Sequence, residues 1–234
     1  MIDCGADWIG RLKAVAPTAI LLTHAHSDHA FGLAQGAACP VHATDETWSL
    51  IKRFPLADRH TVEPRRPFRI DTISFEAFAV EHSLRAPAVG YRITSGRITV
   101  FYVPDLAAIR EPAEALRGVA LYIGDGATVT RSMVRRRGHD LIGHATVGAQ
   151  LAWCREEGVK HAIFTHCGSE IARSDARVIK ARIFKLGLGH GVDARVADDG
   201  LTLSLPGWRG GAAERLRPSC PAGSGRAARG SKPG

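Results

Sequence analysis

Three histidines and one aspartate lie within six residues of one another in the stretch "LLTHAHSDHAFG". They are His24, His26, Asp28 and His29, in the spacing H-x-H-x-D-H. Imidazole and carboxylate groups are ligands that zinc, manganese and iron accept in proteins. In a tight loop His24 and His26 can reach one ion, while Asp28 and His29 turn toward a second. The spacing therefore predicts a metal site, and the alternative is a surface loop that happens to be rich in histidine.

Further potential ligands come directly after apolar, strand-like segments: His82 after 73–80, Asp105 after 97–103 and His166 after 161–165. The ends of strands are where sheet-based folds collect their chemistry, because a rigid scaffold there directs loop side chains into one crevice. We therefore expect these side chains to meet the His24–His29 cluster at the strand exits.

Strand-like and helix-like segments alternate along the chain, which is typical of a mixed α/β fold. Strands are expected at 19–23, 73–80, 89–94, 97–103, 119–123 and 161–165. Helices are expected at 44–53, 106–117, 127–137, 146–157 and 174–186. The pair Asp199-Gly200 tolerates positive φ and predicts a hairpin between 193–197 and 201–205.

Composition indicates a globular protein rather than a membrane protein, since no run of about 18 apolar residues is present. The five cysteines, an odd number without a CxxC pair, indicate reduced thiols and a cytoplasmic location. Residues 207–234 carry six of the basic residues against one acid, Glu214, and supply +5 of the net charge of +8. This stretch is rich in Gly, Ala and Pro, so we expect a domain over 1–206 and a disordered basic tail over 207–234.

The motifs resemble the metallo-β-lactamase-fold hydrolases, whose signature is His-x-His-x-Asp-His, over residues 2–205. "MIDCG" resembles the end of the family's early strand, with Asp3 in a supporting role. "VEHSLRAPAVGYRI" resembles the third-motif region with His82, and "VFYVPD" offers Asp105. "GHATVGAQLAWCREEGVKHAIFTHCG" resembles ribonuclease Z and its bacterial cyclic-phosphate phosphodiesterase relatives, and supplies His144 and His166. The resemblance implies an α/β (α+β) fold, a four-layer αββα sandwich.

The resemblance also implies a ligand set for two divalent ions, with zinc favoured over manganese or iron. His24, His26 and His82 would hold the first ion, Asp28, His29 and His166 the second, and Asp105 would bridge them. Two ions about 3.5–4 Å apart can share and deprotonate a water, which would attack a phosphodiester. His144, grouped with Asp28 as a candidate catalytic residue, would bind the phosphate or protonate the leaving oxygen.

Several assignments stay open at the level of sequence. Asp125 in "IGDGAT" is a second candidate for the bridge, although we favour a hydrogen bond from it that orients a ligand. Arg92 is a candidate for phosphate contact, since Arg binds phosphate oxygens bidentately. The basic run "VRRRGHD" at 134–140 is either a solvated face or a rim that attracts an anionic substrate.

The substrate is expected to be a small anionic phosphodiester. Only 22 residues separate His82 from Asp105, which leaves no room for the tRNA-gripping arm of bacterial ribonuclease Z. Nucleic acid is therefore the less favoured partner, no membrane partner is expected, and a homodimer is open.

One alternative is an acyl (thioester or lactone) hydrolase of the same fold. The chain begins at "MIDCG", where the family has earlier strands, so the first strands are expected to be missing or to lie upstream. A second alternative, if their loss abolishes activity, is a non-catalytic, metal-stabilised binding protein.

Overall fold

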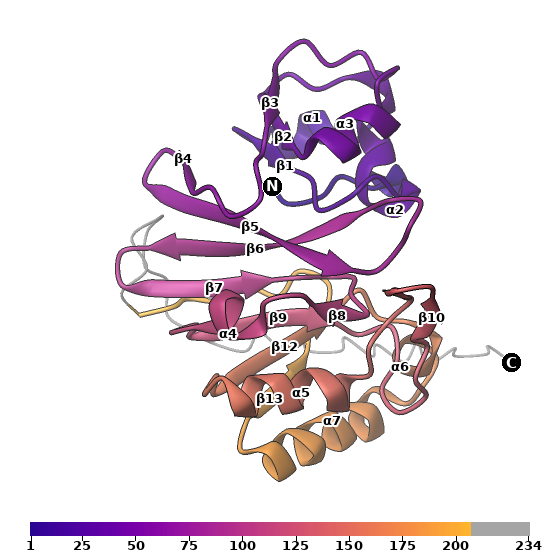
Figure 1. Ribbon diagram of the computed structural model, residues 1–234, viewed down its shortest axis with the longest axis vertical. Coiled ribbons are helices and arrows are strands. Elements are labelled where there is room, and N and C mark those ends of the chain that lie inside the picture. Colours follow the sequence, from indigo (N-terminus) through magenta and orange to yellow (C-terminus); the bar gives the residue numbers. More distant parts are fainter. Residues whose placement is uncertain (207–234) are drawn as a thin grey trace, which may run out of the picture.

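Two β-sheets stack face to face and helices cover their outer faces in the computed structural model, which describes residues 1–206 (Figure 1). Helices α1 and α3 lie over the smaller sheet, and α5 and α7 lie under the larger one. This arrangement confirms the expected four-layer αββα sandwich. The predicted boundary at residue 206 remains a prediction, because the basic tail lies outside the described residues.

The smaller sheet holds three parallel strands in the order β1 (Ile20–Leu21), β2 (Val41–Ala43) and β3 (Arg59–Thr61). Its outer face is covered by α1 (Leu12–Val15), α2 (Ser27–Ala30), α3 (Asp45–Leu50) and two short 3₁₀ helices, η1 (Ala6–Trp8) and η2 (Phe31–Gln35). Ile20, Leu22 and Val41 pack there against Trp48 and Ile51 in one buried cluster. This packing fixes the strand exit from which the His24–His29 segment departs.

The larger sheet runs in the order β13-β12-β9-β7-β6-β5-β4, with β8 paired to β5. Its strands are β4 (Phe68–Ile70), β5 (Ile73–Glu81), β6 (Ala88–Ser95), β7 (Ile98–Tyr102), β8 (Ala108–Ile109), β9 (Leu121–Asp125), β12 (His161–Thr165) and β13 (Asp193–Val196). Strands β7, β9, β12 and β13 are parallel, whereas β4 to β7 form an antiparallel meander. The ends of β5, β7, β9 and β12 supply the later site residues.

Side chains of the central strands point alternately to the two faces of this sheet, and apolar side chains are buried on both faces. Phe101, Tyr122 and Phe164 are fully buried in the cluster that contains the helical layer. That layer consists of α4 (Pro112–Leu116), α5 (Val147–Glu156), α6 (Ser169–Ala172) and α7 (Ala176–His190). Each large side chain buried in this way contributes about 1.5–3 kcal/mol, which makes the sheet a rigid base for its exit loops.

Two hydrogen bonds join β6 of the larger sheet to the segment that follows β1, close to the site. Tyr91 of β6 is fully buried, and its hydroxyl donates to the Leu22 carbonyl oxygen at 2.8 Å. The Val89 N–H donates to the Thr23 carbonyl oxygen at 3.0 Å. The first metal-motif loop is therefore held directly against the larger sheet.

Three expectations about local structure were wrong. Segment 127–137 is not a helix: β10 (Arg135–Arg137) pairs antiparallel with β11 (Asp140–Ile142). Segment 201–205 forms no strand, so the hairpin expected around Asp199-Gly200 is absent from the described residues, and β13 pairs only with β12. The helix expected at 106–117 contains only Pro112–Leu116, because Ala108–Ile109 joins β5 as β8. Among the described residues, no helix combines the length and the apolar character needed to cross a bilayer.

Candidate metal centre

The seven side chains that the sequence proposes as ligands converge at the strand exits between the two sheets. His24 and His26 follow β1, Asp28 and His29 lie on α2, His82 follows β5, Asp105 follows β7, and His166 follows β12. They form two groups that share Asp105, within each of which the ligand atoms lie within 4.8 Å of one another. The sheets thus bring together residues that are up to 142 positions apart, from His24 to His166.

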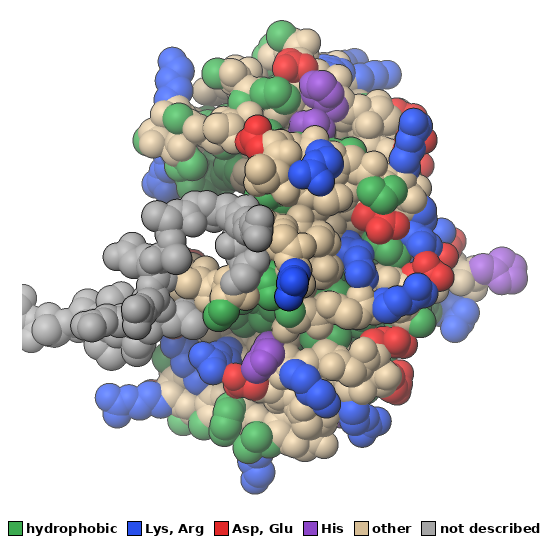
Figure 2. Space-filling view, turned by 90° about the vertical axis from the view of Figure 1, so that its left-hand side faces the viewer, with side chains coloured by type: hydrophobic (Ala, Val, Ile, Leu, Met, Phe, Trp, Pro, Cys, Tyr) green, Lys and Arg blue, Asp and Glu red, His purple; other side chains and the backbone are tan. Residues whose placement is uncertain are grey.

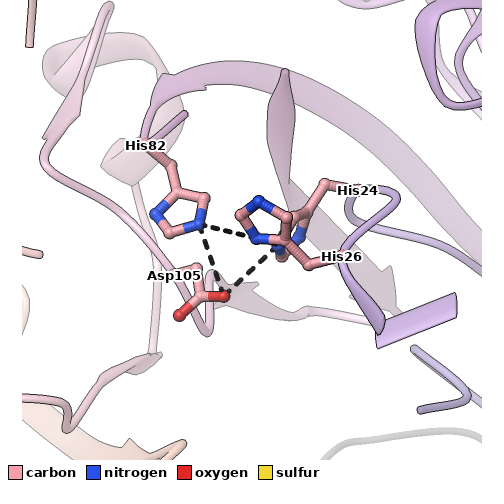
Figure 3. Close-up of side chains that lie close together, drawn as sticks. All are labelled: His24, His26, His82 and Asp105. Carbon is pink, nitrogen blue, oxygen red and sulfur yellow. Dashed lines mark hydrogen bonds and ion pairs between the residues drawn. The ribbon is translucent and has the colours of Figure 1, made fainter. Parts of the chain in front are cut away.

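Figure 3 shows the first group, in which three imidazole rings and one carboxylate point toward a common centre. His26 Nδ1 lies 2.9 Å from His24 Nε2 and 3.2 Å from His82 Nε2. Asp105 Oδ2 lies 3.4 Å from His24 Nε2 and 3.7 Å from His82 Nε2. A tetrahedral zinc ion with bonds of about 2.1 Å places its ligand atoms about 3.4 Å apart, so the spacing fits one ion.

The second group is built around the same aspartate. His29 Nε2 lies 2.9 Å from Asp105 Oδ2 and 3.5 Å from Asp28 Oδ2. The His166 ring lies between the two carboxylates, with Nδ1 2.9 Å from Asp105 Oδ1 and Nε2 3.2 Å from Asp28 Oδ2. Within residues 1–206, His29 Nε2, Asp105 Oδ1 and His166 Nδ1 are buried and, in spite of these short separations, have no partner with the geometry of a hydrogen bond. Buried polar atoms are rarely left in that state, and a cation would satisfy them.

In three of the histidines the ring nitrogen that faces away from the centre is hydrogen-bonded: His24 Nδ1 to Thr23 Oγ1 at 3.0 Å, His29 Nδ1 to Asp3 Oδ2 at 2.8 Å, and His82 Nδ1 to the Gly143 carbonyl oxygen at 3.2 Å. The Thr23 hydroxyl itself donates to Asp3. Because each Nδ1 therefore donates its proton outward, the Nε2 lone pairs face the centre, which is the arrangement typical of metal-binding histidines. Asp3 thus lies where the sequence resemblance placed its supporting role.

Two of these residues have left-handed backbone conformations. Asp3 has φ of 57° and His166 has φ of 50°. Such conformations are costly for side-chain-bearing residues and cluster at functional sites. Close backbone packing supports the Asp3 turn, because a Cβ at Gly5 would lie 2.0 Å from the Asp28 carbonyl oxygen. A larger residue at position 5 would displace α2 together with Asp28.

The charge balance of the cluster favours a cation. Burial opposes protonation of His29, yet the adjacent Asp105 and Asp3 carboxylates outweigh burial and raise its pKa to about 10. For His166, burial is likewise outweighed by Asp105 and Asp28, and its pKa rises to about 9. Burial would raise the pKa of Asp105, but His166 and His29 hold it well below its usual range. Protons on two rings therefore supply positive charge that bound metal ions would otherwise supply.

Desolvation acts differently on the three histidines of the first group. Burial lowers the pKa of His24 well below its ordinary value and also lowers those of His26 and His82. These rings are therefore neutral near pH 7, and only neutral imidazole can bind a metal ion. The first group is accordingly prepared for a cation without loss of a proton.

His144 lies beside the two groups and is held by Asp125. Its Nδ1 lies 2.8 Å from Asp125 Oδ2 and 3.5 Å from Asp105 Oδ1. Burial opposes protonation of His144, but the hydrogen bond with Asp125 outweighs it and raises the pKa of the ring. The opposite nitrogen, Nε2, is directed away from Asp125 and can serve as a proton donor or a phosphate ligand.

Hydrogen bonds distinguish the two aspartates, Asp105 and Asp125, that the sequence left open. Asp125 Oδ2 accepts from the Leu106 N–H at 3.1 Å as well as facing His144, and its Oδ1 accepts from the Ala127 N–H at 2.7 Å. Asp105, Asp125, His144 and His166 also lie within ligand distance of one another. The Asp125 carboxylate already has these partners and orients His144, whereas Asp105 is the carboxylate that the two ligand groups share.

Sequence reasoning missed one residue that supports the site and misplaced another. Gln150 of α5 is fully buried; its Oε1 accepts from the Asp125 N–H at 2.9 Å, and its Nε2 donates to the Asp125 carbonyl oxygen at 2.7 Å. A polar residue on the buried face of the expected helix 146–157 was the available signal. Arg92, considered for phosphate contact, instead donates to the carbonyl oxygens of Glu114 and Ala115.

Comparisons with known proteins agree with this geometry. A family model described as "Beta-lactamase superfamily domain" matches residues 1–167. No curated protein sequence matches the chain.

Several solved structures share the fold. The metallo-β-lactamase-fold protein YhfI from Bacillus subtilis has 16% identity and a TM-score of 0.64, over 86% of this chain and 84% of that chain. A diphosphatase from the PhnP family has 22% identity and a TM-score of 0.58, over 86% and 76%. The short form of human tRNase Z has 17% identity and a TM-score of 0.61, over 88% and 87%.

The fold and the converging His/Asp groups define a metallo-β-lactamase-fold hydrolase. The family model covers most of the described residues, so the chain belongs to the beta-lactamase superfamily. The sequence resemblance to this fold is therefore confirmed.

Proposed function

We propose that this protein is a dinuclear metal-dependent phosphodiesterase. The observation that carries the proposal is the presence of two groups of potential ligands that share the buried Asp105, with the Asp125–His144 pair beside them. His24, His26 and His82 would hold one divalent ion, Asp28, His29 and His166 the other, and Asp105 both. When bound, the two ions would lower the pKa of a shared water and neutralise charge on the phosphoryl oxygens.

The protein's own residues would perform the remaining steps. The side chain of Asp28 is 60% exposed and lies on the open side of the second group, where its free oxygen can orient the attacking water. His144 would carry a proton on Nε2, since the Asp125 hydrogen bond raises its pKa. That proton would pass to the leaving alkoxide oxygen as the ester bond breaks, which is the general-acid step of hydrolysis.

Three features support a phosphodiester rather than an acyl substrate. A general acid beside paired ligand groups suits an alkoxide leaving group, which departs poorly without a proton. The exposed arginines of β10 lie in the segment that leads directly to His144 and make the rim of the site basic, which suits an anionic substrate rather than a neutral acyl ester. The structural neighbours include a PhnP-family diphosphatase and a tRNase Z.

Parallel assays test the proposal. The purified protein would be loaded with zinc, manganese or iron and offered bis-p-nitrophenyl phosphate, p-nitrophenyl acetate and an acyl thioester. We expect two equivalents of bound metal and turnover of the phosphodiester. The His26→Ala variant should lose at least about 100-fold in rate, because a first-group ligand is removed.

His161→Ala is the matched control, since His161 is an exposed histidine at the opposite end of β12 from His166. It should retain both metal and activity. Turnover of the acyl esters alone would replace the proposal with an acyl hydrolase. Two equivalents of metal without any hydrolysis would indicate the non-catalytic binding protein instead.

A further inference from the structure

We propose that the β10–β11 hairpin binds a further phosphate group of the substrate, next to the scissile diester. This inference rests on the proposed phosphodiesterase function and narrows its substrate class. The preferred substrate would be a nucleotide-type diester with at least one additional phosphate, rather than an isolated diester. The observations that carry it are the anchoring of the hairpin to the candidate metal centre and its unpaired arginines.

The hairpin is attached at its base to the end of β5 and to His82, which follows it. The Gly143 N–H donates to the His82 carbonyl oxygen at 2.8 Å, and His82 Nδ1 donates to the Gly143 carbonyl oxygen at 3.2 Å. The Leu141 N–H donates to Glu81 Oε2 at 2.7 Å. Gly143 itself immediately precedes His144. The hairpin is therefore a fixed extension of the site rather than an independent surface loop.

Antiparallel pairing determines how the arginines are displayed. Arg135 pairs with Ile142, Arg136 with Leu141 and Arg137 with Asp140. Because side chains alternate along a strand, Arg135 and Arg137 project from one face and Arg136 from the other. A strand of three residues spans about 10 Å, so Arg135, which pairs with Ile142, lies nearest the base of the hairpin, and Arg137 lies farthest along it.

The positive charge of the β10–β11 hairpin is not neutralised by neighbouring acidic residues. Arg135, Arg136 and Arg137 are all exposed, and none forms an ion pair with another residue in the described part of the chain. Two more arginines of the neighbouring loops, Arg85 and Arg131, are likewise exposed and unpaired within residues 1–206. The one acid of the hairpin, Asp140, lies 3.8 Å from Arg110. An uncompensated cluster of this kind attracts anions.

The opposite side of the molecule shows a different distribution. On the face in Figure 2, which looks onto the side away from β10, Lys and Arg side chains are scattered and interspersed with Asp and Glu. Arginine, with its planar fork of donors, is the side chain best suited to bidentate contact with phosphate oxygens.

The scissile phosphate itself does not need these arginines. Its oxygens would face the two ligand groups and His144, which already provide positive charge and a proton donor. A second phosphate, one linkage farther along the substrate, would lie toward the hairpin. Such a phosphate could belong to a mononucleotide or to a nucleic acid strand, and these share the chemistry that the arginines would bind.

Paired probes with one leaving group test this inference. Thymidine 5′-(p-nitrophenyl phosphate) would be compared with the same ester that carries a 3′-phosphate. We expect KM to be about tenfold lower for the 3′-phosphorylated ester, as for one charge-assisted contact, with similar kcat. The Arg135→Gln/Arg136→Gln/Arg137→Gln variant should abolish this preference while retaining turnover of bis-p-nitrophenyl phosphate, since Gln keeps the backbone pairing of the hairpin.

The matched control removes three exposed basic residues elsewhere, as Arg155→Gln/Lys160→Gln/Lys185→Gln, and should keep the preference. A p-nitrophenyl ester of trithymidylate distinguishes the two sources: a further decrease in KM indicates a strand, and no further decrease indicates a mononucleotide. Equal KM values for the two thymidine esters would overturn the inference, as would a preference that survives in the hairpin variant or disappears in the control.

A binding measurement separates failure of this inference from failure of the proposed function. Calorimetry with thymidine 3′,5′-bisphosphate and thymidine 5′-phosphate needs no turnover. Suppose that no diester is hydrolysed, but the bisphosphate binds about tenfold more tightly than the monophosphate and this preference depends on the hairpin arginines. Phosphate binding by the hairpin is then supported, while the phosphodiesterase proposal fails. Equal binding of both nucleotides, together with diester hydrolysis, would refute only the proposal that the hairpin binds a further phosphate.

Discussion

Replacement of Gln150 by leucine should damage both the stability of the fold and the geometry of His144. The Gln150 side chain is fully buried and accepts hydrogen bonds from the Asp125 N–H and the Tyr122 hydroxyl, each at 2.9 Å. It also donates to the carbonyl oxygens of Asp125 and Ala145, at 2.7 Å and 3.2 Å. One side chain thus holds the backbone on both sides of Asp125 and next to His144.

The magnitude follows from the partners that Gln150→Leu leaves behind. Two buried donors, the Asp125 N–H and the Tyr122 O–H, lose their acceptor, at about 1–3 kcal/mol each, so the expected destabilisation is about 2–6 kcal/mol. A typical domain has a free energy of unfolding of about 5–15 kcal/mol, so the variant should remain folded at low temperature. Urea unfolding monitored by circular dichroism would measure the difference.

A kinetic signature separates loss of positioning from loss of stability. If Gln150 holds Asp125 and thereby His144, the variant should lose more rate with a phenyl leaving group than with p-nitrophenyl, because the poorer leaving group depends more on a proton donor. Tyr122→Phe is the control: it removes one hydrogen bond, costs about 1 kcal/mol and leaves Gln150 bonded to Asp125. Equal losses with both leaving groups, or a destabilisation below 1 kcal/mol, would refute the reasoning.

Three further predictions concern the ligand groups. In the metal-free protein the raised pKa values of His29, about 10, and His166, about 9, contribute stability that is fully present below pH 6.5 and is lost as pH rises through those values. Thermal unfolding of the chelated protein should therefore show Tm falling from pH 6.5 to 10, and zinc affinity measured by competition with a chelator should rise over the same range, because both protons must leave. Asp105→Asn should lower bound metal from two equivalents to one or fewer by elemental analysis, since both groups lose their shared carboxylate; retention of both ions would exclude Asp105 as the bridge. Asp3→Asn weakens the acceptor for His29 Nδ1 and should reduce metal affinity about 10–100-fold without abolishing it, as measured by zinc competition.

Strand and helix identity could be predicted for several segments from their local apolar pattern. The segments expected at 73–80, 89–94 and 161–165 correspond to β5, β6 and β12, and the helix expected at 146–157 is α5. The wrong expectations fall on 106–117, 127–137 and 201–205. In 127–137 the helix-like pattern was overridden because Arg135–Arg137 pairs with the strand after the Gly138 turn, and that pairing depends on a neighbour rather than on local propensity.

The amino-acid sequence by itself determined which side chains could bind metal. The tight His-x-His-x-Asp-His loop needs further ligands from elsewhere in the chain. His82, Asp105 and His166 could be identified as candidates because each follows a strand-like segment. Only the tertiary structure distinguished Asp105 from Asp125, because it shows that the Asp125 carboxylate already has hydrogen-bond partners. It alone also showed that Gln150 supports the site and that Arg92 does not. Local spacing limits what a side chain can reach, whereas the register of strands distant in sequence determines what it contacts.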